Sequence, residues 1–242
     1  MCRGCILTPD EASVITKLDC KNCPLLTSLP ELPSVTSLYC GDCPLLTSLP
    51  ELPHVTHLYC RNCPLLTSLP ELSQAIYLDC YKCPLLTSLP ELLRVTELNC
   101  NNCPLLTSLP ELPHVTHLYC GNCPLLTSLP KLLCATILNC SYCPRLITLP
   151  KLPRIIILNC NNCPRLKYVP ILPQHYKDTF IEYYPGTTPD ENFLKRPLKL
   201  LVLKVIMKWK RTIYKRKILS LHLWRFGLQD VKGIILSFLM KS

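Results

Sequence analysis

The chain has 242 residues, of which 48% are hydrophobic and only 17% are charged, and this composition excludes an intrinsically disordered protein. No run of 18 apolar residues occurs, so no membrane-spanning helix is predicted. The net charge of +10 is uneven, because residues 171–242 carry +9 and residues 1–170 carry only +1. We therefore expect a nearly neutral body with a basic C-terminal end.

Residues 1–14 are interpreted as an N-terminal cap. They mix polar and apolar side chains, include Asp10 and Glu11, and lack the apolar stretch of a secretory signal peptide. This favours an intracellular, cytoplasmic protein.

A repeat follows, in which the motif Cys-x-x-Cys-Pro recurs eight times. It begins at Cys20, Cys40, Cys60, Cys80, Cys100, Cys120, Cys140 and Cys160, so the spacing is the same every time. The octet CPLLTSLP is identical in six of these copies. A constant period without insertions predicts that each copy is one coil of a solenoid. Residues 35–54 serve as the reference coil, numbered as repeat positions 1 to 20.

Apolar residues fall at positions 1, 4, 6, 9, 12, 15 and 18 of the reference coil. The alternation around positions 4 and 6 predicts a short strand with one buried face. Two or three prolines per coil exclude a regular helix on the return path and favour extended, polyproline-like backbone.

The pattern Val/Ile-x-x-Leu-x-Cys-x-x-Cys-x-x-Leu-x-x-Leu-Pro resembles the leucine-rich repeat family over residues 15–174, in eight coils. The resemblance implies a repeat solenoid with a parallel sheet on its concave face and an extended convex side. It implies a scaffold and no particular chemistry, since members of the family share a fold. Such near-identical copies also resemble repeat proteins of large DNA viruses.

Sixteen of the 19 cysteines form two ladders, at positions 6 and 9. They occupy positions that the family directs inward, so a core role is favoured in which Cys acts as a small hydrophobe with a weak S–H donor. The Cys-x-x-Cys spacing leaves zinc open, and the coil spacing leaves disulfides open.

No Ser-His-Asp order, phosphate-binding glycine loop or His-Glu-x-x-His motif occurs, and glycine is scarce. We therefore expect a non-catalytic protein with no cofactor, no bound metal and no small-molecule substrate.

Positions 3, 5 and 7 vary between otherwise similar coils, and the alternation places them together on the predicted concave face. Many are residue types that favour interfaces. The predicted partner-binding residues are Tyr39, His57, Tyr59, Arg61, Tyr77, Tyr81, Glu97, Asn99, His117 and Tyr119. Tyr39 and Tyr59 should lie on neighbouring strands and be exposed to solvent. Drift at unconstrained positions would produce the same variability and stays open.

The C-terminal part is interpreted as a linker over 175–197 followed by a basic helical segment over 198–242. An apolar set from Val202 to Ile213 has helical spacing, and the opposite side carries Lys204, Lys208, Arg211 and Lys215. Three roles are open for this segment. It caps the solenoid, it binds an anionic membrane or nucleic acid, or it recruits a ubiquitin-ligase adaptor, because residues 230–239 resemble the first helix of an F-box.

Overall fold

The computed structural model describes residues 7–167 and 180–182. The chain divides into two units, Met1–Thr188 and Pro189–Ser242, and every described residue belongs to the first. The basic segment with Lys204, Lys208, Arg211 and Lys215 and the F-box-like stretch lie outside the described residues.

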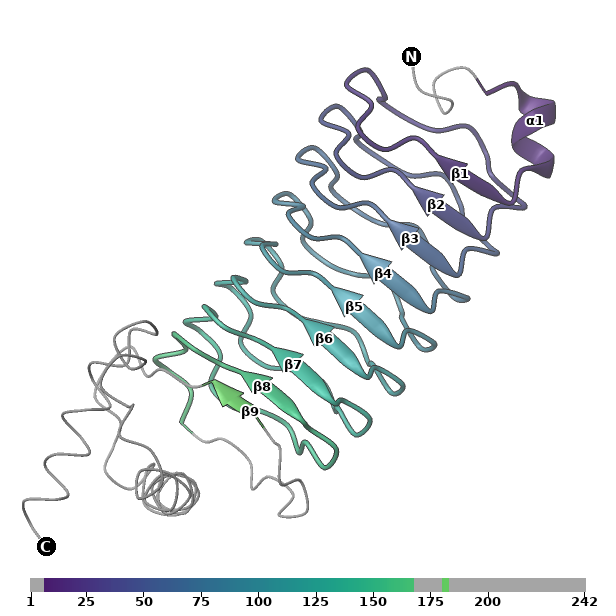
Figure 1. The fold of residues 1–242 in the computed structure, drawn as a ribbon. Coiled ribbons are helices and arrows are strands. Elements are labelled where there is room, and N and C mark those ends of the chain that lie inside the picture. Colours follow the sequence, from purple (N-terminus) through teal and green to yellow (C-terminus); the bar gives the residue numbers. More distant parts are fainter. Residues whose placement is uncertain (1–6, 168–179, 183–242) are drawn as a thin grey trace, which may run out of the picture. The chain divides into compact units, whose positions relative to one another are not determined.

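Within residues 7–167 and 180–182, nine short strands form one parallel sheet in the order of the chain (Figure 1). Each of the first seven pairs in register with the equivalent strand of the next coil, as Leu38 pairs with Leu58. The strands are β1 (Lys17–Asp19), β2 (Ser37–Tyr39), β3 (His57–Tyr59), β4 (Tyr77–Asp79), β5 (Glu97–Asn99), β6 (His117–Tyr119), β7 (Ile137–Asn139), β8 (Ile157–Asn159) and β9 (Phe180–Glu182).

The described coils form a leucine-rich-repeat solenoid, which confirms the predicted fold class. Strands β2, β3 and β5 show the pattern, in which a buried leucine at position 4 lies between two less buried neighbours. The return segments contain no helix within the described residues, in agreement with their prolines.

Helix α1 (Pro9–Val14) precedes the first coil. Thr8 caps its N-terminus in a capping box with Glu11, and Pro9 occupies its first turn. Ala12 is buried and belongs to the same core as the coils. The role of residues 1–14 as a cap for the solenoid stays a prediction.

The core is a set of ladders that run through the coils. In the reference coil, positions 1, 4, 6, 9, 12 and 18 are buried, and position 15 is partly buried. All sixteen ladder cysteines are buried, which confirms the core interpretation, and no described cysteine is in a disulfide.

The two cysteine ladders are joined by hydrogen bonds. Each position 9 thiol from the second coil onward donates to the position 6 carbonyl of the preceding coil, as Cys43 Sγ does to the Cys20 carbonyl at 3.3 Å. Burial raises the pKa of the Cys123 and Cys143 thiols to about 12. These two thiols therefore stay protonated at neutral pH and poorly reactive.

Position 8 of every coil has left-handed backbone, with φ between 54° and 60°. Asparagine and aspartate tolerate this conformation better than other residues with a side chain, and they occupy six of the eight sites. The exceptions are Lys82 and Tyr142, with φ of 55° and 56°.

Replacing Tyr142 by asparagine should therefore stabilise the fold, by about 1 kcal/mol. Tyr142 is 58% exposed, so little packing is lost. The reciprocal change, Asn122→Tyr, should destabilise the fold by a similar amount. Urea unfolding of both variants tests this, and a loss of stability in Tyr142→Asn would contradict it.

Strand β9 lies within residues 175–197, which the sequence indicates as a linker. It pairs with β8 through Phe180 and Ile157, whereas the repeat period would align Ile157 with residue 177. The sheet thus continues past the eighth coil, out of step with the repeat.

None of the helices in the described part of the chain is long and apolar enough to cross a membrane.

Candidate functional site

The ten predicted partner-binding residues lie on strands β2 to β6 or two residues beyond the end of such a strand. Those at positions 3 and 5 flank a fully buried leucine, so they face away from the core. We call the surface formed by positions 3, 5 and 7 of the coils the sheet face.

Four of these residues form a continuous aromatic ladder. Tyr39 and Tyr59 pair in register, and their rings stack with centroids 4.5 Å apart and planes 7° apart. Tyr59 contacts Tyr77 on the next strand at 4.6 Å, with the planes tilted by 31°. His57 stacks on Tyr77 at 6.3 Å. Tyr119 lies further along the sheet, on β6.

The three tyrosines of the ladder are half-buried, whereas the sequence predicts exposed side chains. The difference arises because each ring covers part of the next. Burial raises the pKa of Tyr59, and that of Tyr77 to about 12. Both hydroxyls are therefore neutral at physiological pH and able to donate hydrogen bonds.

A cation already lies on the first ring of the ladder. Lys17 Nζ is 5.2 Å from the Tyr39 ring centroid, within the range of a cation–π interaction. Lys82 Nζ lies 5.3 Å from the centroid of Tyr81 in the same way. Arg61 is positioned by Asp42, since its Nε is 3.5 Å from the Asp42 Oδ2.

Position 5 has a second, local role that alternation alone does not reveal. In five coils it is Asp or Asn, whose side-chain oxygen accepts a hydrogen bond from the backbone N–H two positions later. Asn99 does this for Asn101 at 3.3 Å. That Asn99 also contacts a partner stays a prediction.

The remaining three coils carry tyrosine at position 5 and Gly or Arg at position 7, and they lack the turn at positions 7 and 8. A Cβ added at Gly41 would lie 3.0 Å from Arg61 Cγ and 3.2 Å from the Arg61 carbonyl oxygen. Positions 5 and 7 thus vary together. Comparing the two positions coil by coil would have revealed these two types of coil.

The predicted histidines and Glu97 make polar contacts along position 3. Thr56 Oγ1 lies 2.9 Å from His57 Nδ1, and His117 Nδ1 lies 3.9 Å from Glu97 Oε2. Within residues 7–167 and 180–182, no three His, Cys, Asp or Glu side chains are grouped so that they could hold a metal ion.

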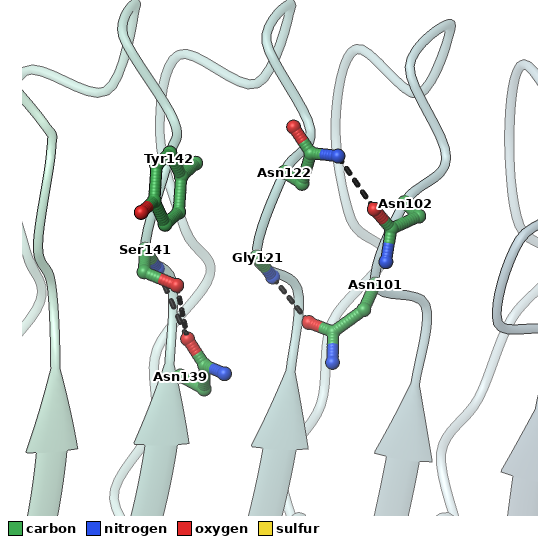
Figure 2. A pocket seen from close by; sticks show the side chains of 7 residues that line it. All are labelled: Asn101, Asn102, Gly121, Asn122, Asn139, Ser141 and Tyr142. Carbon is green, nitrogen blue, oxygen red and sulfur yellow. Dashed lines mark hydrogen bonds between the residues drawn. The ribbon is translucent and has the colours of Figure 1, made fainter.

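A shallow depression of about 440 Å³ lies beyond the C-terminal ends of β5 to β7 (Figure 2). Its polar groups bond mainly to one another. Asn101 accepts from the Gly121 N–H, Asn122 donates to Asn102, and Ser141 donates to Asn139 at 2.8 Å. It is lined by Asn101, Asn102, Gly121, Asn122, Asn139, Ser141 and Tyr142, which include no carboxylate or basic group.

A second exposed surface runs along position 11, where the side chains of successive leucines are partly free. Leu45 and Leu65 are 41% and 40% exposed. We call this surface the outer leucine row, which consists of Leu25, Leu45, Leu65, Leu85 and Leu105. Unlike the sheet face, it carries the same residue in each of these five coils.

Comparison with protein-family models and with curated proteins found no match. Among solved structures, the chain is similar to YopM, a leucine-rich effector protein from Yersinia pestis, at 25% identity and a TM-score of 0.47. The match covers 71% of this chain and 62% of that chain, so this chain corresponds to less than two thirds of YopM. The resemblances to viral repeat proteins and to an F-box gain no support from these comparisons.

Proposed function

We propose that this chain is a non-catalytic scaffold that binds a protein partner through its sheet face. The observation that carries the proposal is the aromatic ladder of Tyr39, Tyr59, Tyr77 and His57 on three adjacent strands. A row of stacked rings is a rigid, partly apolar surface with polar edges, and tyrosine is enriched where interfaces gain most of their affinity.

The leucine-rich-repeat fold supports the same function, because it aligns side chains from successive coils on one surface. Adjacent strands pair in register, so each residue lies beside the residue at the same repeat position of the next coil. Side chains that are one full repeat apart in the sequence thereby become neighbours. A partner segment laid across the strands would contact several coils at once. The interpretation of the variability as drift is weakened at positions 5 and 7, because the residues there differ between the coils that have a turn at positions 7 and 8 and the coils that lack it.

Photo-crosslinking can test which surface the partner contacts. Ser37 lies on the sheet face beside Tyr39, and Ser48 is exposed on the return segment of the same coil. With benzoylphenylalanine at one of these positions in the full chain, we expect a crosslinked partner from Ser37 and none from Ser48. Crosslinking from Ser48 alone would contradict the proposal.

A further inference from the structure

The middle of the sheet face combines aromatic rings with negative charge. Tyr59 pairs in register with Asp79, and Tyr77 pairs with Glu97. Two rings and two carboxylates are thereby brought together on strands β3, β4 and β5, although they come from three different coils. We call these four residues the acidic-aromatic cluster.

Neither carboxylate of the cluster forms an ion pair with a lysine or arginine of the described chain. The ion pairs formed by Lys21 and Arg61 go to Asp19 and Asp42. Among the described residues, the ionisable partner of Glu97 is the imidazole of His117, at 3.9 Å, and the Glu97 side chain is 38% exposed.

Asp79 is held in place as a largely buried carboxylate. It is 7% exposed, and its Oδ1 accepts a hydrogen bond from the Tyr81 N–H at 3.2 Å. Burial raises the pKa of Asp79, while that hydrogen bond and the charge of Arg61 lower it. A carboxylate withdrawn from water interacts more strongly with any cation that comes close to it.

We propose that the acidic-aromatic cluster binds an arginine side chain in a basic segment of the protein partner. This inference rests on the proposed function of the sheet face. The planar guanidinium group can stack on the ring of Tyr77, which pairs in register with Glu97, and donate two parallel hydrogen bonds to the exposed Glu97 carboxylate, which a lysine ammonium cannot do. Asp79 adds a second negative charge from the neighbouring strand β4. Lys17 on Tyr39 shows that a ring of this ladder accepts a cation on its face.

The same rings could stack on the bases of a single-stranded nucleic acid. The charge of the cluster disfavours this alternative, because two carboxylates would repel the phosphates. Binding to an oligonucleotide is therefore one outcome that the experiment has to distinguish.

The test uses the full-length protein and fluorescence anisotropy with labelled hexa-arginine, hexa-lysine and a short oligothymidylate. The double variant Asp79→Asn with Glu97→Gln removes both charges. Asparagine keeps the acceptor for the turn, as Asn99 and Asn139 do at the same position of their coils. The matched control, Asp19→Asn with Glu91→Gln, makes the same chemical changes at exposed sites elsewhere.

We expect hexa-arginine to bind more tightly than hexa-lysine. The cluster double variant should weaken hexa-arginine binding on the order of 10- to 100-fold, which is the range for charge-assisted hydrogen bonds, and the control double variant should change it less than about threefold. Equal losses in both double variants, equal affinity for the two peptides, or oligothymidylate that binds the unmodified protein more tightly than hexa-arginine does would overturn the inference.

Affinity for the crosslinked partner separates this inference from the proposed function. If Tyr39→Ala with Tyr59→Ala weakens the partner while the cluster double variant does not, the sheet face is the interface and the arginine inference is wrong. If neither variant changes the affinity, both are wrong. If both variants weaken it, both are supported.

Discussion

Truncating Leu98 to alanine should destabilise the fold by about 2–5 kcal/mol. Leu98 is fully buried at the centre of β5 and pairs in register with Leu78 and Leu118 on the two neighbouring strands. In a solenoid each coil gains its stability from contacts with its neighbours, so a cavity in a central coil weakens two interfaces. Urea unfolding followed by circular dichroism measures the change.

The same coil provides the control. Leu105, in the outer leucine row, is 39% exposed, and Leu105→Ala should change stability by no more than about 0.5 kcal/mol. Similar losses for the two variants would mean that the strand register of this coil is wrong. The assignment of the sheet face would then fail as well, since it depends on that register.

The fold could be predicted because the repeat leaves little freedom. Its constant period aligns each leucine and cysteine with its counterpart in the next coil. The same register between successive coils then follows from one pattern, and alternation decides which side of each strand is buried. Cys40 and Cys60 are buried for this reason.

Strand β9 could not be predicted in this way. Phe180 pairs with Ile157 outside the repeat period, and the segment before it lacks the Cys-x-x-Cys-Pro signal. Pairing at the end of a sheet depends on backbone hydrogen bonds that any extended segment can supply. The sequence pattern carries little information about such a strand.

The members of the sheet face could be read from the sequence, but their interactions could not. Alternation places Tyr39 and Tyr59 on neighbouring strands, whereas their mutual burial depends on ring orientation. The alternation of buried and exposed positions groups Asp79 with the exposed variable residues, yet Asp79 is only 7% exposed. Its burial arises from contacts between coils, which no single repeat reveals.

Replacing Tyr39 and Tyr59 together by alanine should weaken binding of the crosslinked partner about 30-fold, as expected for the loss of about 2 kcal/mol at an interface anchor. The stacked pair forms one end of the aromatic ladder, and the buried leucine ladder beneath it is left unchanged. Leu45→Ala with Leu65→Ala is the matched control, because it removes two partly exposed side chains from the same two coils.

The decisive measurement is the dissociation constant of the partner for these two double variants, by isothermal titration calorimetry, with urea unfolding to confirm that both are folded. The proposed interface predicts an increase of about 30-fold for the tyrosine pair and less than about threefold for the leucine pair. A folded tyrosine variant that binds as tightly as the unmodified chain would contradict the assignment of the sheet face as the binding surface.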